Sequence, residues 1–391
     1  MGILGIGGPA VAGATPAATT LTQADLDRII GGQANTLLGR LRSTQAGVNY
    51  AVAVAFAYPN QGFNPFYMYG DVGAQTPPTE RTLFAIGSLT KTFTAALFAN
   101  GAFMRNDCFD WDASLTRYLN GYLGPNQNLS PAVQKMTPRM LAQQTSGFPK
   151  PATGDQDGIG LFQTDPSKPP PSLTQAWETH NGPAPGTCWE YSNLGFITLG
   201  FTTVSAYGCA GAKDLAYSAM LRDYLTQPLN MPDTVTTAPE GAPVAQGNPN
   251  GRPALSASGA SDLKSSAADL HTWMTAHLGA ANQSSNLMKG LAATTQPTPL
   301  AVEMCGRQNA PGPKFMGLAW QIEPGPPQIV WKDGLTELGG CACWMGMILG
   351  TTTQHPLGIA IMVNGYSNTQ RTKILPDAYG RSMLKQIAAA A

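Results

Sequence analysis

Strand-like segments lie at both ends of the sequence, and a long region without them separates the two groups. Near the start, residues 49–58 form a Val- and Ala-rich segment, and a second strand is expected at 66–69. Beyond residue 315 the pattern returns in four segments, at 316–322, 328–332, 341–349 and 357–363. Strands from both ends can share one antiparallel sheet if the helical region between them is inserted as a lobe. The sequence therefore predicts an α+β fold, an antiparallel sheet flanked by helices.

The same pattern predicts how the chain is divided. Residues 21–108 and 280–391 are expected to form the sheet domain, and residues 109–279 the mostly helical lobe. Residues 1–20 are small and apolar and are interpreted as a disordered leader, the remnant of an export signal, which favours a secreted or periplasmic protein. Helices are expected at 22–41, 89–99, 137–144, 194–207, 266–278 and 371–388.

Composition excludes several classes of partner. Only 12% of the residues are charged, the formal net charge is zero, and no run of Lys or Arg occurs, so neither nucleic acid nor an anionic membrane is expected to bind. No apolar stretch is long enough to span a membrane, so no membrane span is expected. The expected partner is a small-molecule or short-peptide substrate. The histidines are scattered without ligand spacing, and no metal or other cofactor is predicted.

The six cysteines form an even number in a large chain. This number permits disulfides, and buried free thiols are an equal alternative, so the pairing stays open. Cys341-Ala-Cys343 is not a zinc pair, because no histidine stands at a matching spacing.

The most informative short motif is Ser88-Leu-Thr-Lys91, at the start of an apolar helix. A spacing of three residues places the hydroxyl and the amine on one helix face. Burial disfavours the charged form of Lys91, so this amine can accept the proton of Ser88. A backbone N–H at the helix start can form half of an oxyanion hole. The absence of Gly-x-Ser-x-Gly disfavours a Ser-His-Asp hydrolase.

Both this motif and a second one occur twice. Ser261-Asp-Leu-Lys264 repeats the first motif in a stretch typical of a solvated turn, and Tyr-Ser-Asn occurs at 191–193 and at 366–368. A single Tyr-x-Asn or Lys-Asp-Gly is usually only a turn. The first copies alone form an ordered series, which runs from Ser88-x-x-Lys91 through Tyr191-Ser-Asn193 to Lys332-Asp-Gly334. This order favours a functional site.

The ordered motifs resemble those of the penicillin-recognising serine hydrolases of the serine β-lactamase and penicillin-binding-protein superfamily. They are most similar to the class C β-lactamase branch, which includes D-Ala-D-Ala carboxypeptidases and family VIII esterases. Further similar segments are 136–149, 185–195, 258–270 and 317–320. The resemblance covers about residues 45–385 and implies a β-lactamase/transpeptidase-like fold.

The resemblance also implies a role for each motif residue. Ser88 would attack the carbonyl, Lys91 would accept or relay its proton, and Tyr191 would act with Lys91 as the general base. The substrate-binding residues that it implies are Asn193, Lys332, Gly334, Leu335 and Arg371.

Among these substrate-binding residues, Asn193 would orient the substrate amide, and Lys332 would hold the oxygen of Tyr191 and a substrate carboxylate. The N–H groups of Ser88 and Leu335 would form the oxyanion hole. Arg371 is a second candidate partner for the carboxylate.

Two departures from the family pattern bear on the substrate. Asp333 stands where the β-lactamases have Thr, and Lys150-Pro151 stands where they have a Gln that contacts the substrate amide. Asp333 is expected to repel a substrate carboxylate unless its side chain points away. Both departures argue against efficient β-lactam turnover. The segment 317–320, the Lys332 motif and Gly339-Gly340 resemble more closely the branch of low-activity β-lactamase-like peptidases, which implies a D-Ala-D-Ala carboxypeptidase or peptidase with weak β-lactam reactivity. A carboxylesterase or acyltransferase is one alternative, and a penicillin-binding receptor with slow turnover is another.

Overall fold

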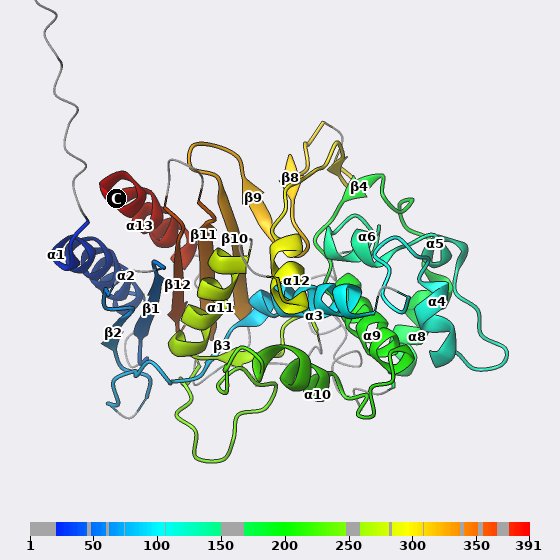
Figure 1. The fold of residues 1–391 in the computed structure, drawn as a ribbon, viewed down its shortest axis with the longest axis horizontal. Helices are drawn as coiled ribbons and strands as arrows, with labels where there is room; N and C mark the ends of the chain where they lie inside the picture. The colour runs from blue at the N-terminus through cyan, green and yellow to red at the C-terminus, as the bar shows by residue number, and fades with distance from the viewer. Residues whose placement is uncertain are drawn as a thin grey trace, which may run out of the picture.

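A computed structural model describes residues 21–44, 48–59, 62–73, 75–105, 107–149, 168–247, 259–280, 284–307, 309–336, 340–350, 355–365 and 375–391. Within these residues an eight-stranded sheet has the order β2-β1-β12-β11-β10-β9-β8-β6, and every neighbouring pair is antiparallel (Figure 1). The strands are β1 Ala51–Ala57, β2 Phe66–Gly70, β6 Thr298–Pro299, β8 Phe315–Met316, β9 Gln321–Glu323, β10 Ile329–Thr336, β11 Cys341–Ile348 and β12 Leu357–Val363. The predicted antiparallel sheet built from both ends of the chain is confirmed.

Helices cover both faces of this sheet (Figure 1). The first face carries α1 Gln23–Leu26, a π-helical turn Asp27–Gly31, α2 Gly32–Arg42 and α13 Pro376–Ala390. The second face carries α3 Thr90–Met104 and α11 Ala267–Gly279. Side chains alternate along β1, so its larger residues, such as Val54, meet α2 and α13, while its alanines, such as Ala53, meet α11. Both faces of β1 are therefore buried.

Several short helices and one long helix, α9, lie in the region between the two groups of strands. They are α4 Thr116–Leu119, α5 Pro131–Gln134, α6 Pro138–Ala142, α8 Pro171–Thr179, α9 Asn193–Cys209 and α10 Tyr217–Leu221, with single turns at Gly87–Leu89, Asn120–Tyr122 and Arg222–Thr226. Helix α3 packs against α9 and against α12 Asn286–Thr294. Two small pairs of strands complete the described elements, β3 Phe84–Ala85 with β5 Lys264–Ser265, and β4 Cys188–Trp189 with β7 Glu303–Met304. The domain division itself stays a prediction.

One predicted strand is wrong. The segment 316–322, predicted as a single strand that includes 317–320, is divided between β8 and β9, and residues 317–320 form a tight turn between these two short strands. Ala319 has a positive φ of 73°, and the backbone N–H groups of Leu318 and Ala319 donate to Thr294 and Ala142 outside the sheet. Apolar side chains here fill the core next to these partners, so the apolar pattern reflects burial and not a continuous strand.

The cysteines divide between the two alternatives that the sequence left open. Cys108 is bonded to Cys209, and Cys188 is bonded to Cys305. Cys341 and Cys343 are free and buried in β11. The first disulfide connects the loop after α3 to the end of α9, and the second joins β4 to the loop after β7. Both cross more than 100 residues of sequence.

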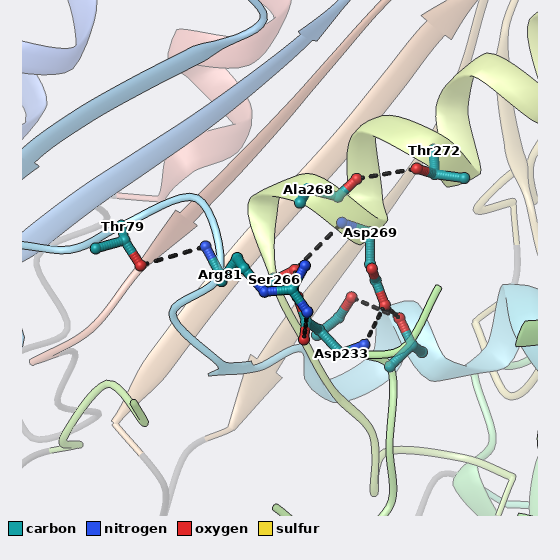
Figure 2. A network of polar contacts seen from close by, with 9 residues as sticks. Thr79, Arg81, Asp233, Ser266, Ala268, Asp269 and Thr272 are labelled. Atoms are coloured by element: carbon teal, nitrogen blue, oxygen red, sulfur yellow. Dashed lines mark hydrogen bonds and ion pairs between the residues drawn. The ribbon is translucent and has the colours of Figure 1, made fainter. Parts of the chain in front are cut away.

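A polar network fixes the N-terminus of α11 beside the segment that leads to β3 (Figure 2). Ser266 caps the helix and donates its hydroxyl to Asp233, which also forms an ion pair with Arg81 at 2.6 Å. Asp269 is 2% exposed, and its Oδ2 accepts hydrogen bonds from the backbone N–H of Asp233 and the hydroxyl of Thr234, both at 2.8 Å. Burial raises the pKa of Asp269 to about 6.

Replacing Asp269 with alanine should lower the free energy of unfolding by about 2–4 kcal/mol, because two buried donors lose their acceptor.

Asp269→Asn keeps an acceptor oxygen and removes the titration of this side chain. Since the folded-state pKa lies above the ordinary value, the stabilising contribution of this carboxyl is complete below about pH 4 and is lost as pH rises through 6. The Asn variant should therefore gain stability relative to the wild type by about 2–3 kcal/mol between pH 4 and pH 7. Urea denaturation at both pH values measures this difference, and a difference that does not change with pH would contradict it.

Candidate active site

Ser88 lies in the turn that joins β3 to α3. This turn packs directly on β10, because Gly87 adopts a φ of +49° and a Cβ on it would lie 2.7 Å from the carbonyl oxygen of Leu335. Gly334 is equally constrained, since a Cβ there would lie 2.0 Å from the carbonyl oxygen of Ile86. The two glycines let the backbones that carry Ser88 and Leu335 approach each other. The segments that carry both predicted oxyanion-hole donors are thus brought together.

Helix α3 delivers the predicted lysine to the serine. Lys91 is 0% exposed, as the apolar helix predicted, and its ammonium Nζ donates to Ser88 Oγ at 3.0 Å. Two further acceptors hold the same nitrogen, Asn193 Oδ1 at 2.7 Å and the carbonyl oxygen of Ala260 at 2.8 Å. Lys91 is therefore fixed by three hydrogen bonds, and one of them reaches the nucleophile.

Tyr191 completes the cluster from the loop between β4 and α9. Its hydroxyl is hydrogen-bonded to Ser88 Oγ, and the Lys91 nitrogen lies 4.9 Å from the centre of its ring. Ser192 caps α9 and accepts the N–H of Gly195, so Asn193 is the first residue of the helix. The order Tyr-Ser-Asn thus places a hydroxyl and an amide on either side of a helix cap, and both reach the Ser88–Lys91 pair.

Electrostatics in this cluster favour proton transfer from serine. Burial lowers the pKa of Lys91, because the charged ammonium has lost its water. Burial alone would raise the pKa of Tyr191, but the nearby charges of Lys91 and Lys332 more than offset it, so this pKa lies below its usual value. Lowered pKa values favour the phenolate of Tyr191 and the neutral amine of Lys91, and either of these bases, in contact with the Ser88 hydroxyl, can take its proton.

Lys332 lies at the site but makes different contacts from those predicted. Its nitrogen lies 5.5 Å from the centre of the Tyr191 ring, and its hydrogen bonds within the described residues go to Asp333, at 2.6 Å to Oδ1 and 2.8 Å to the backbone oxygen. Burial would lower the pKa of Lys332, but Asp333 and Tyr191 outweigh it and the pKa is raised. The carboxyl of Asp333 points toward the lysine and not away from it.

Two contributors were not found by sequence reasoning. Ala260 gives its carbonyl oxygen to Lys91, and Gln144, with a positive φ of 62°, receives the N–H of Ser192 on its side-chain oxygen and that of Glu190 on its backbone oxygen. Both residues lie in segments that the family resemblance singled out, 258–270 and 136–149. That resemblance was the available signal, since backbone acceptors leave no motif of their own.

The second copies of the motifs do not build another site in the described residues. Lys264 lies in β5, and its nitrogen donates weakly to the backbone oxygen of Thr236 at 3.4 Å and not to Ser261. Residues 366–368, Arg371 and Lys150-Pro151 lie outside the described residues, so their predicted roles stay predictions. No group of metal-ligating side chains occurs in the described part of the chain. Across the same residues, no helix has the length and apolarity of a membrane span.

Comparisons with known proteins identify the family of this chain. A model of the family described as Beta-lactamase matches residues 44–380. A beta-lactamase of Yersinia enterocolitica is 26% identical over 338 residues, which are 83% of this chain and 76% of the relative. A beta-lactamase of Escherichia coli K12 is 26% identical over 58% of this chain, which spans 56% of that relative.

Solved structures share the fold. A beta-lactamase/D-alanine carboxypeptidase from Pseudomonas syringae has a TM-score of 0.67 at 20% identity and covers 91% of this chain and 98% of its own. A class C beta-lactamase has a TM-score of 0.69 at 17% identity and covers 94% of this chain and 97% of its own. The extent of the family match, together with the shared fold, shows that the chain belongs to the beta-lactamase family of serine hydrolases.

Proposed function

We propose that this protein hydrolyses ester or amide carbonyls through an acyl-enzyme on Ser88. The observation that carries the proposal is the contact of one serine oxygen with both Lys91 and Tyr191, in a partly buried cluster with lowered pKa values for the amine and the phenol. A serine is a weak nucleophile at its ordinary pKa and needs such partners.

The reaction follows from these contacts in two steps. Ser88 Oγ attacks the carbonyl carbon while its proton passes to Tyr191 or Lys91, and the N–H groups of Ser88 and Leu335 stabilise the oxyanion. The same proton then goes to the leaving alkoxide or amine, which departs and leaves the acyl group on Ser88. Water adds in the second step, gives up a proton to the same pair, and releases the acid and free Ser88.

Three activities are candidates for this acyl-enzyme. D-Ala-D-Ala carboxypeptidase activity with weak β-lactam reactivity is supported by Lys332 as a cation at the site and by the name of the P. syringae structure. Esterase or acyltransferase activity needs only Ser88, Lys91 and Tyr191. A receptor that is acylated and turns over slowly needs the same three residues but poor water placement.

A direct experiment compares intact mass and turnover with three probes: nitrocefin, a D-Ala-D-Ala peptide and a p-nitrophenyl ester. We expect a transient adduct on Ser88 and measurable hydrolysis of at least one probe. A persistent adduct without turnover would identify the receptor. Absence of both adduct and turnover with all probes would refute the acyl-enzyme.

We also propose that the protein is located in an oxidising compartment. The two disulfides support a secreted or periplasmic location, because such bonds persist mainly outside the cytosol. Fractionation of the native host followed by immunoblotting tests it, and recovery only in the cytosolic fraction would contradict it.

A further inference from the structure

In the motif Lys332-Asp-Gly334, Asp333 is the counter-ion of Lys332. Lys332 and Asp333 are consecutive residues of β10, and the lysine nitrogen donates to Asp333 Oδ1 at 2.6 Å and to the Asp333 carbonyl oxygen at 2.8 Å. The side chain of Lys332 is 3% exposed, whereas that of Asp333 is 41% exposed. Two of the three ammonium protons are therefore directed to Asp333, and the carboxylate, not the ammonium, is accessible to solvent.

This ion pair lies beside the nucleophile. The Lys332 nitrogen is 5.5 Å from the centre of the Tyr191 ring, and the Tyr191 hydroxyl contacts Ser88. Gly334, the next residue of β10, packs its backbone against Ile86, two residues before Ser88. Strand β9 pairs with β10 only at residues 329–331. A substrate whose carbonyl lies between Ser88 and Leu335 N–H is thus within reach of the Lys332–Asp333 pair.

The pair has no net charge, and this changes what it can bind. A substrate carboxylate that approaches Lys332 also approaches the negative charge of Asp333, and it competes for ammonium protons that are already donated. An uncharged substrate meets neither cost. Because Lys332 is buried and Asp333 is exposed, an approaching substrate carboxylate is repelled by Asp333 before it can bind Lys332.

We propose that Asp333 is a specificity-determining residue that selects substrates without a carboxylate next to the scissile bond, with neutral esters and amides as the substrate class. The selection rests on the acyl-enzyme function proposed above. It favours the esterase candidate over the carboxypeptidase, because a D-Ala-D-Ala peptide ends in a carboxylate at this position.

A matched pair of aryl esters tests the selection, 3-carboxyphenyl acetate and 3-carbamoylphenyl acetate. These esters deliver the same acyl group and differ only in the charge of the leaving group. For the wild type, kcat/KM should be lower for the carboxylate ester than for the carboxamide ester.

Asp333→Asn keeps the shape of the side chain and an acceptor oxygen for Lys332 but removes the charge. It should raise the ratio of kcat/KM for carboxylate over carboxamide by about tenfold or more.

Three further variants separate charge from shape. Asp333→Thr, also neutral, should raise the ratio in the same direction, and Asp333→Glu, which keeps the charge, should leave it low. Lys332→Met added to Asp333→Asn should remove the gain, because the freed ammonium is what binds the carboxylate. An unchanged ratio in both neutral variants, each shown to be folded by circular dichroism, would overturn the proposal.

Boronic acids give a reading that does not depend on turnover. 3-Carboxyphenylboronic acid and its carboxamide analogue bind a nucleophilic serine, so Asp333→Asn should lower the ratio of Kd for the carboxylate over the carboxamide while it raises the ester kcat/KM ratio. If neither ester nor boronate acts at Ser88, the acyl-enzyme function fails, and the selection fails with it. If Ser88 reacts and both ratios stay unchanged, only the selection by Asp333 fails.

Discussion

Replacing Ser88 with alanine should reduce kcat/KM by about 10³-fold or more on every substrate that the wild type hydrolyses, and should abolish the covalent adduct. The oxygen that this change removes is the one that contacts both Lys91 and Tyr191, so no other group in the cluster can replace it as the nucleophile. Lys91 keeps Asn193 and Ala260 as acceptors, and the fold should therefore persist. Steady-state kinetics and intact mass measure the loss.

The chain supplies a matched control for this variant. Ser261 belongs to the second Ser-x-x-Lys motif, whose lysine has no recorded hydrogen bond to it and donates to Thr236. Ser261→Ala should keep kcat/KM within about threefold of the wild type. A labelled Ser88→Ala protein, or an inactive Ser261→Ala protein, would show that the wrong copy of the motif was assigned.

The second large effect is expected for Lys91→Met, which keeps the length of the side chain and removes the amine. Activity should fall by about 10²- to 10⁴-fold, the range for loss of a general base. The pH profile should also change, because Lys91 is the strongest of the charges that lower the pKa of Tyr191. Without it this pKa rises, so the phenolate forms only at higher pH, and the rising limb of kcat/KM should move to higher pH.

Lys264→Met is the control for this prediction, because Lys264 occupies the same place in the second motif and lies outside the cluster. It should change neither the rate nor the pH profile. Circular dichroism of the Lys91 variant checks the fold, since three acceptors lose their donor, and the buried one, the Ala260 carbonyl oxygen, costs about 1–3 kcal/mol. Retention of more than a tenth of the activity with an unshifted profile would contradict the role of Lys91.

Much of the sheet could be predicted because its strands are long and buried. The segment 357–363 is β12 with the predicted bounds, and 341–349 differs from β11 by one residue. The short strands near residue 320 could not be predicted, since two or three residues carry no period and Ala319 takes its backbone conformation from tertiary hydrogen bonds. The pairing of four cysteines was equally inaccessible, because it joins residues more than 100 positions apart.

The sequence by itself determined which residues assemble around the nucleophile. Three motifs in order selected Ser88 and Lys91 over their second copies, because a helix fixes the spacing of a hydroxyl and an amine, and a capped helix start fixes Tyr191 and Asn193. Only the tertiary structure decided the partners of the two lysines. Ala260 reaches Lys91 through its backbone, and Lys332, although close to the Tyr191 ring, donates hydrogen bonds to Asp333. The burial of each lysine and its distance to possible acceptors determine these hydrogen-bond partners, and neither quantity can be read from the order of residues along a chain.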